Sequence, residues 1–189
     1  GTTALGVNAD NGFAITASSD LVSLDLVTRG DGLGATSLST ATQSFGFARN
    51  GSALDISTVA STIPLTNLAV TVNVGDIRVV GTGASSIAAD GLSLTASGNL
   101  TLDGSSSAVV LSNVSQTFRG TNVRVNGQGT LRATGTQEFR SQGGAGNVEF
   151  LSSGGAITVD AADQVLASTQ DILLQGGSAA NEGVTVAAT

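Results

Sequence analysis

One short pattern recurs along the chain at nearly constant spacing. It consists of Asp or Asn, an apolar residue, a variable residue and a second apolar residue. The first apolar residues of its five copies are Ile77, Leu100, Val123, Val148 and Ile172. The steps between them are 23, 23, 25 and 24 residues, and a weaker copy, Ala53-Leu54-Asp55-Ile56, lies 23 residues before the first. Such a period predicts a repeat protein, in which each unit buries its apolar side against the next unit.

Each unit contains enough apolar residues for three strands. Two further apolar runs follow each copy, such as residues 109–111 and 114–118 after Leu100. Alternating apolar residues bounded by Gly, Ser, Asn and Asp are typical of β-strands and turns. The sequence therefore predicts an all-β fold, a single-stranded parallel β-solenoid (β-helix). Each coil is expected to hold about 24 residues in three short strands, with coils about 4.8 Å apart.

The residue before each copy predicts how the coil turns its corner. These corner residues are Asp76, Asn99, Asn122, Asn147 and Asp171. Asp and Asn side chains bond to nearby backbone groups and favour turns. We expect the stacked Asn side chains to bond each other in a ladder. Gly75, Gly98 and Gly146 precede three of the corner residues, and we expect each to take a positive φ there.

Alternation within the copies separates an inward column from an outward one. The predicted inward core column is Ile77, Leu100, Val123, Val148 and Ile172. Burial of each such side chain is worth about 1.5–3 kcal/mol. The predicted outward column is Arg78, Thr101, Arg124, Glu149 and Leu173. Opposite charges at Arg124 and Glu149 are neighbours in this column, which favours the same stacking.

The repeat divides the chain into two parts. Residues 1–50 lack the regular step and are expected to form irregular N-terminal coils or a cap. Residues 51–189 are expected to form the regular stack, which we expect to continue beyond the last residue.

Composition excludes several functions. The net charge is −7 and all seven basic residues are Arg, so no basic face is expected to bind nucleic acid. The chain has no Cys and no His, which removes the usual zinc ligands and imidazole-based catalysis. No run of 18 apolar residues occurs, so no membrane insertion is expected.

The carboxylates give no convincing active site. Asp160 and Asp163, together with Glu149, come nearest to the paired acids of a glycoside hydrolase. No Lys or His is present as a partner base, and Trp and Tyr are absent. We therefore interpret these acids as solvated turn residues. The stretch 143–148 begins like a calcium-binding solenoid repeat, but Val148 stands where the ligand Asp belongs. No catalytic, cofactor or metal site is predicted.

The repeat Gly98-Asn99-Leu100-Thr101-Leu102 resembles the repeats of filamentous-haemagglutinin-type adhesins. It is also similar to the β-helical shafts of phage tail spikes and fibres. The resemblance is one of pattern and covers about residues 51–189. Likeness to the adhesins implies a right-handed helix, exposed on a bacterial cell surface or secreted, that contacts host or neighbouring cells. Likeness to the phage shafts implies a virion protein in which three chains share one shaft.

These observations lead to a structural rather than an enzymatic expectation. We expect a rigid stalk that binds protein or glycan on a cell surface, or other subunits of a filament. Binding is expected on loops that interrupt the repeat, with candidates at 30–50, 103–108 and 176–183. The alternative is the shaft of a phage tail fibre or injection device, a homo-oligomer. A third alternative is a polysaccharide depolymerase.

The inward and outward columns yield a first test. Val123→Asp would place an unpaired carboxylate in an apolar column, so we expect it to lower the free energy of unfolding by several kcal/mol. Thr101→Asp would point outward between two arginines and should be tolerated or slightly stabilising. Chemical denaturation of both variants checks this expectation. Equal effects would show that the two columns are wrongly assigned.

Overall fold

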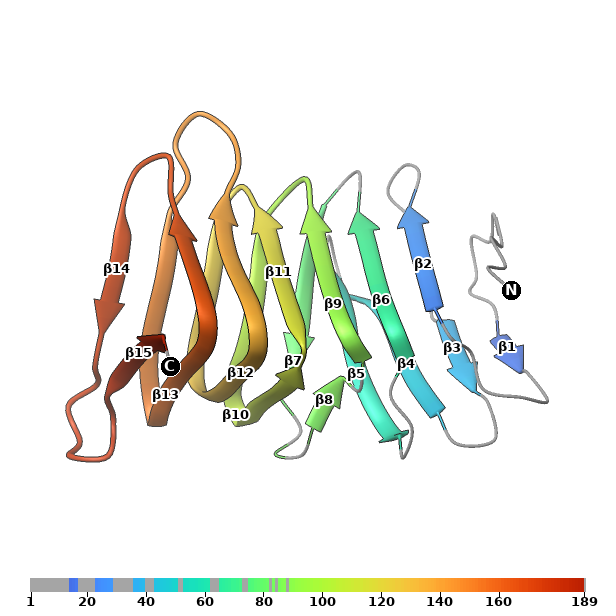
Figure 1. Ribbon diagram of the computed structural model, residues 1–189, viewed down its shortest axis with the longest axis horizontal. Coiled ribbons are helices and arrows are strands. Elements are labelled where there is room, and N and C mark those ends of the chain that lie inside the picture. The colour runs from blue at the N-terminus through green and yellow to red at the C-terminus, as the bar shows by residue number, and fades with distance from the viewer. Residues whose placement is uncertain are drawn as a thin grey trace.

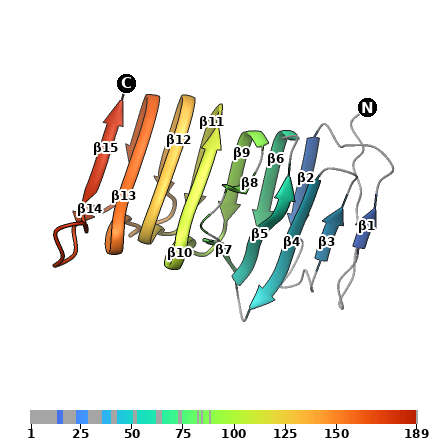
Figure 2. The same ribbon diagram turned by 90° about the horizontal axis from the view of Figure 1, so that it is seen from below.

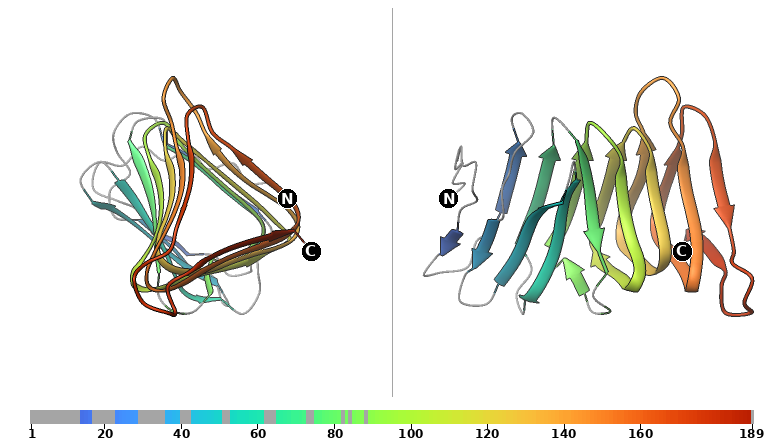
Figure 3. Two further views of the ribbon diagram at one scale, coloured as in Figure 1. Left: turned by 90° about the vertical axis from the view of Figure 1, so that its left-hand side faces the viewer. Right: turned by 180° about the vertical axis from the view of Figure 1, so that it is seen from behind.

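Every regular element in the described part of the chain is a strand (Figure 1). The computed structural model describes residues 14–16, 23–28, 36–39, 43–50, 53–61, 65–72, 75–81, 83, 85–87 and 89–188. Successive coils lie side by side along one axis, from β1 near one end to β14 and β15 at the other (Figures 1 and 2). Seen along that axis, the coils superimpose as a triangle (Figure 3). The predicted all-β parallel solenoid is confirmed.

Face one of the triangle carries the repeated pattern. It is formed by β5 (Ala53–Ser61), β7 (Asp76–Val80), the first parts of β10 (Leu100–Asn113), β12 (Val123–Ser141) and β13 (Val148–Ala167), and β14 (Ile172–Gln175). These strands pair in parallel, and Leu54, Ile77 and Leu100 are successive register partners. The same file continues through Val123 and Val148 to Ile172. The period of the sequence is therefore the length of one coil.

Two further faces complete each coil. Face two consists of β8 (Ser85–Ile87), the middle parts of β10, β12 and β13, and β15 (Val184–Ala188). Face three consists of β2 (Ser23–Thr28), β6 (Leu65–Val72), β9 (Ala89–Ala96), β11 (Ser115–Gly120) and the last parts of β12 and β13. The long strands bend from one face to the next where their pairing shifts register, as between Gly127 and Gly129.

The interior is narrow and apolar. Ile77, Leu100, Val123 and Val148 are fully buried, as the inward column requires. The largest buried side chains are three phenylalanines on two different faces. The ring centres of Phe118 and Phe139 are 4.9 Å apart, and those of Phe139 and Phe150 are 5.1 Å apart. Ring pairs at this separation add stabilisation beyond the area they bury.

The inward column is not buried along its whole length. Ile172 is 47% exposed and Leu174, the second inward residue of the same strand, is 51% exposed. Both belong to β14, which pairs with β13 on one side only among the described residues. The expectation that Ile172 is a core residue is therefore wrong in this structure, because a solenoid coil is covered only when another coil follows it.

The early strands depart from the parallel pattern. β1 (Ala14–Thr16) pairs in parallel with β3 (Thr36–Ser39). β3 pairs antiparallel with β4 (Gln43–Asn50), and β4 pairs antiparallel with β5. By contrast, β2 pairs in parallel with β6 and extends face three. Parallel and antiparallel pairing thus occur together among β1 to β6, and the antiparallel pairing extends to β5, which lies in the part expected to form the regular stack.

The glycines before the corners serve two different purposes. Gly75 has a φ of 113°, as expected for a glycine that turns the chain. Gly98 and Gly146 do not have a positive φ, so that expectation was wrong for them. A Cβ on Gly146 would lie 2.0 Å from the carbonyl oxygen of Thr121 in the preceding coil. Glycine is required there because neighbouring coils approach too closely for a side chain.

Candidate functional site

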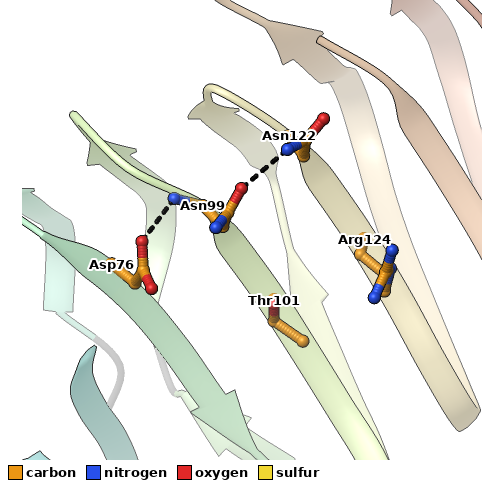
Figure 4. A pocket seen from close by; sticks show the side chains of 5 residues that line it. All are labelled: Asp76, Asn99, Thr101, Asn122 and Arg124. Atoms are coloured by element: carbon orange, nitrogen blue, oxygen red, sulfur yellow. Dashed lines mark hydrogen bonds between the residues drawn. The ribbon is translucent and has the colours of Figure 1, made fainter. Parts of the chain in front are cut away.

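The five predicted corner residues follow one another along one edge of the solenoid, linked by hydrogen bonds. Figure 4 shows the first three, Asp76, Asn99 and Asn122. Asp76 Oδ1 accepts a hydrogen bond of 2.6 Å from the backbone N–H of Asn99. Asn122 Nδ2 donates to Asn99 Oδ1 at 2.8 Å, and Asn122 Oδ1 accepts from the Asn147 N–H at 2.9 Å. Asn147 Oδ1 accepts from the Asp171 N–H at 3.2 Å. The side chains of the first four corner residues therefore each bond to a neighbouring coil, whereas Asp171 takes part through its backbone N–H.

The bonding differs in kind from the ladder of amides that the sequence suggested. Only the Asn99–Asn122 pair is joined by a bond between side chains. The other links run from a side-chain oxygen to the backbone of the following coil. A backbone N–H has a fixed position, so these links also hold the following corner in register.

An open pocket of about 230 Å³ lies beside this edge on face one. Its lining residues are Asp76, Asn99, Thr101, Asn122 and Arg124. They come from three successive coils and are all polar (Figure 4). Arg124 is held in place by Glu149 of the next coil, with Nε and a terminal nitrogen both 2.6 Å from Glu149 Oε2. The pocket is thus a polar surface in which an ion pair holds Arg124.

Charged side chains pair across coils on face three as well. Arg119 and Arg140 are register partners, so two positive charges are neighbours there. Glu138 compensates them, with 3.2 Å contacts to Arg119 and a 2.5 Å contact to Arg140. Partial burial acts to raise the pKa of Glu138, but hydrogen bonds and charge interactions with the two arginines outweigh it and hold the pKa below its ordinary value.

A chain of buried amides runs through the interior where faces two and three meet. We call it the buried amide ladder. It consists of Asn113, Gln116 and Gln137, which are buried, and Gln164, which is partly exposed at its end. Gln164 Nε2 donates to Gln137 Oε1 at 2.6 Å, and Gln137 Nε2 donates to Gln116 Oε1 at 2.5 Å. Gln116 Nε2 in turn donates to Asn113 Oδ1 at 2.7 Å. The ladder ends where Asn113 Nδ2 donates to the carbonyl oxygen of Ala89.

This ladder was not predicted from the repeat pattern, although the order of residues contains a signal for it. Gln116 and Gln137 each stand two residues before a core phenylalanine, and Gln164 stands two residues before Leu166. Residues two apart in a strand share a face, so these side chains had to point inward. They were overlooked because a buried amide is unfavourable until its partners are known.

The candidate loops differ from their predicted extents. Asp103 pairs in register with Val80 and Asn126, so the interruption begins after it. Four residues, 105–108, separate the paired positions Gly104 and Val109, whereas one residue separates Gly127 and Gly129 in the next coil. Residues 176–183 do form a loop between β14 and β15. The range 30–50 contains β3 and β4, and its other residues lie outside the described part.

The loop at 176–183 is held by one carboxylate. Glu182 Oε1 accepts from the Gly154 N–H at 2.6 Å, and Oε2 accepts from the Ala179 N–H at 3.0 Å. These backbone bonds lower the pKa of Glu182. The loop is therefore tied both to itself and to the preceding coil.

The structure does not gather the candidate acids into one site. Glu149 is engaged with Arg124, while Asp160 pairs in register with Arg132 on face two and Asp163 with Thr136 on face three. Asp76 and Asp171 are separated by three intervening corner residues. Within the described ranges, no group of three or more Asp, Glu, His or Cys could hold a metal ion. The described residues also form no helix able to cross a membrane.

Comparisons with known proteins find no matching family model, no matching curated protein and no matching solved structure.

The buried amide ladder gives a stability prediction. Gln137→Leu keeps the bulk of the side chain but leaves Gln116 Oε1 and Gln164 Nε2 without this partner. We expect the free energy of unfolding to fall by about 1–3 kcal/mol, the cost of unpaired buried polar groups. The control Gln142→Leu, at an exposed position, should stay within about 0.5 kcal/mol of the parent. Equal effects in chemical denaturation would show that the ladder contributes no stability.

Glu138 gives a pH prediction. Its pKa is lower in the folded chain than the ordinary 4.5, so the ionised carboxylate stabilises the fold above that pH. The contribution is lost as the pH falls through the lowered pKa. We expect Glu138→Gln to cost about 0.2–1 kcal/mol at pH 7, as exposed ion pairs do. The difference between parent and variant, measured by denaturation from pH 7 to pH 3, should shrink towards zero. A difference independent of pH would contradict this assignment.

Proposed function

We propose that this chain is a rigid, non-enzymatic β-solenoid shaft of a bacterial surface or secreted protein, which binds other cells through loops that interrupt its coils. The observation that carries the proposal is the continuity of the stack. Face one keeps one register from Leu54 to Ile172, and the apolar core fills the space behind it. Such a continuous stack can hold parts of a protein at a fixed distance along its axis. Its outer surface is available for contacts with other molecules.

Rigidity is supported by three kinds of contact between coils. Backbone hydrogen bonds join successive coils on all three faces. Side chains of the corner residues from Asp76 to Asn147 link one coil to the next, and the buried amide ladder links coils in the interior. A slip of one residue would expose the apolar columns and would also leave buried amides unpaired. Bending or sliding of one coil on the next is therefore costly.

The loops support the binding part of the proposal. Pairing resumes at Val109 with Gly129 after residues 105–108, and at Val184 with Ile157 after the loop at 176–183. Insertions of this kind leave the stack intact, and long surface loops cost little closure entropy. Loops on a rigid scaffold are a common place for binding residues.

The phage-fibre alternative would require a different arrangement of chains. In an intertwined trimer, one coil would take its faces from three chains. Here one chain supplies all three faces of its own coils, and three-sided closure needs no partner (Figure 3). This favours a single-chain shaft.

Three measurements test the proposal together. Sedimentation at micromolar concentration should show a monomer, and a stable trimer would favour the fibre. The labelled chain should bind bacterial or host cells or their isolated glycans and release no new reducing ends. New reducing ends would show an enzyme and overturn the proposal.

Loop variants locate the binding. Deletion of residues 105–107 would leave one residue between Gly104 and Val109, the length found in the next coil, so cooperative unfolding should persist. A second variant replaces residues 178–181 with Gly-Ser-Gly-Ser and keeps Glu182. We expect at least one variant to fold and lose cell binding. Full binding by both folded variants would place the binding surface elsewhere.

A further inference from the structure

We propose that the face-one pocket binds a single uncharged pyranose ring of a surface glycan. The inference rests on the proposed adhesive function and adds to it a ligand class and a site on the regular coils, apart from the loops. It follows from the unused polar groups of the pocket, its charge balance and its size.

The pocket presents donors that other residues do not occupy. Asn99 Oδ1 accepts from Asn122, but the Asn99 Nδ2 group has no partner among the described residues. The Thr101 hydroxyl likewise has none there, and it points outward between Arg78 and Arg124 in register. The contacts of Arg124 with Glu149 use Nε and one terminal nitrogen, so its other terminal nitrogen is available to a ligand. These groups come from two adjacent coils and face one pocket (Figure 4).

The charge of the pocket favours an uncharged ligand that both donates and accepts. Arg124 is already paired with Glu149 at 2.6 Å, so it offers an anion no uncompensated positive charge, and the carboxylate of Asp76 repels an anion. The guanidinium of Arg124, which lines the same pocket, opposes a cation near Asp76. Neighbouring sugar hydroxyl groups match the pocket, because each can accept from Asn99 Nδ2 or Arg124 and can donate to the Thr101 hydroxyl oxygen.

Size limits the ligand to about one ring. The volume of about 230 Å³ is below the range of about 300–1,000 Å³ typical of pockets for drug-sized molecules. The lining residues span three coils, a length of about 10 Å at the spacing of parallel strands. No aromatic residue lines the pocket, so a sugar ring finds no stacking partner there. We therefore expect millimolar affinity, which several chains on one surface would raise by multivalency.

Titration of the ¹⁵N-labelled chain followed by NMR tests the proposal. The probes are the methyl pyranosides of glucose, mannose and galactose, with glucuronate and glucosamine as charged comparators, each raised to about 50 mM. We expect at least one uncharged probe to give saturable shifts at the amides of Asn99, Thr101 and Asn122. Thr101→Val removes only the hydroxyl and should weaken binding about 2- to 10-fold, the worth of one neutral hydrogen bond.

The matched control is Thr158→Val. Thr158 is a partly exposed threonine on face two, in register with Thr130 and Thr185, and lies outside the pocket. This variant should bind as the parent does. Equal weakening in both variants, or a charged comparator binding best, would overturn the proposed site.

The remaining outcomes separate this proposal from the adhesive function. Shifts confined to residues 176–183 would overturn the pocket while leaving adhesion through loops in place. No shift with any probe would also overturn the pocket, whereas cell binding would still be judged by the loop variants. Release of free sugar from a methyl glycoside would overturn the non-enzymatic function itself.

Discussion

The structure depends on one constraint, that each coil must lie in register on the coil before it. A single coil exposes its apolar side chains and leaves the backbone hydrogen-bonding groups of its strands without partners, so it cannot be stable alone. Stacking satisfies both needs at once, because parallel pairing places Leu100 on Ile77 and Val123 on Leu100. Where stacking stops among the described residues, at β14, the same side chains are exposed.

The interior combines apolar packing with amides that hydrogen-bond to one another. Apolar columns tolerate some change of partner, whereas a chain of buried amides is favourable only when every member finds the next. Fewer registers of coil pairing are therefore acceptable for the amides of Gln116, Gln137 and Gln164 than for the valines and leucines. The corner residues also favour one register, at the surface, because their side chains bond to the backbone of the next coil.

The same stacking produces the surface on which function is proposed. Residues that are 23 apart in the chain become neighbours, so Asp76, Asn99 and Asn122 form one edge and part of one pocket (Figure 4). A flat sheet of fixed spacing presents its polar groups without the reorganisation that a mobile loop needs. The loops after Gly104 and before Val184 add variable surfaces to this rigid frame.

The repeat by itself determined the fold class, the length of a coil and the residues that share a column. This was possible because the side-chain period of a strand and the period of the coil are both visible in the order of residues. The sequence also located the corner residues. It did not reveal that they bond to the backbone of the next coil, or that Gly146 is required by the close approach of the preceding coil. Those features, like the buried amide ladder, the antiparallel pairing of β3, β4 and β5, and the exposure of Ile172, were decided by the tertiary structure. Each of them depends on distances between residues far apart in the chain, and such distances exist only once the coils have stacked.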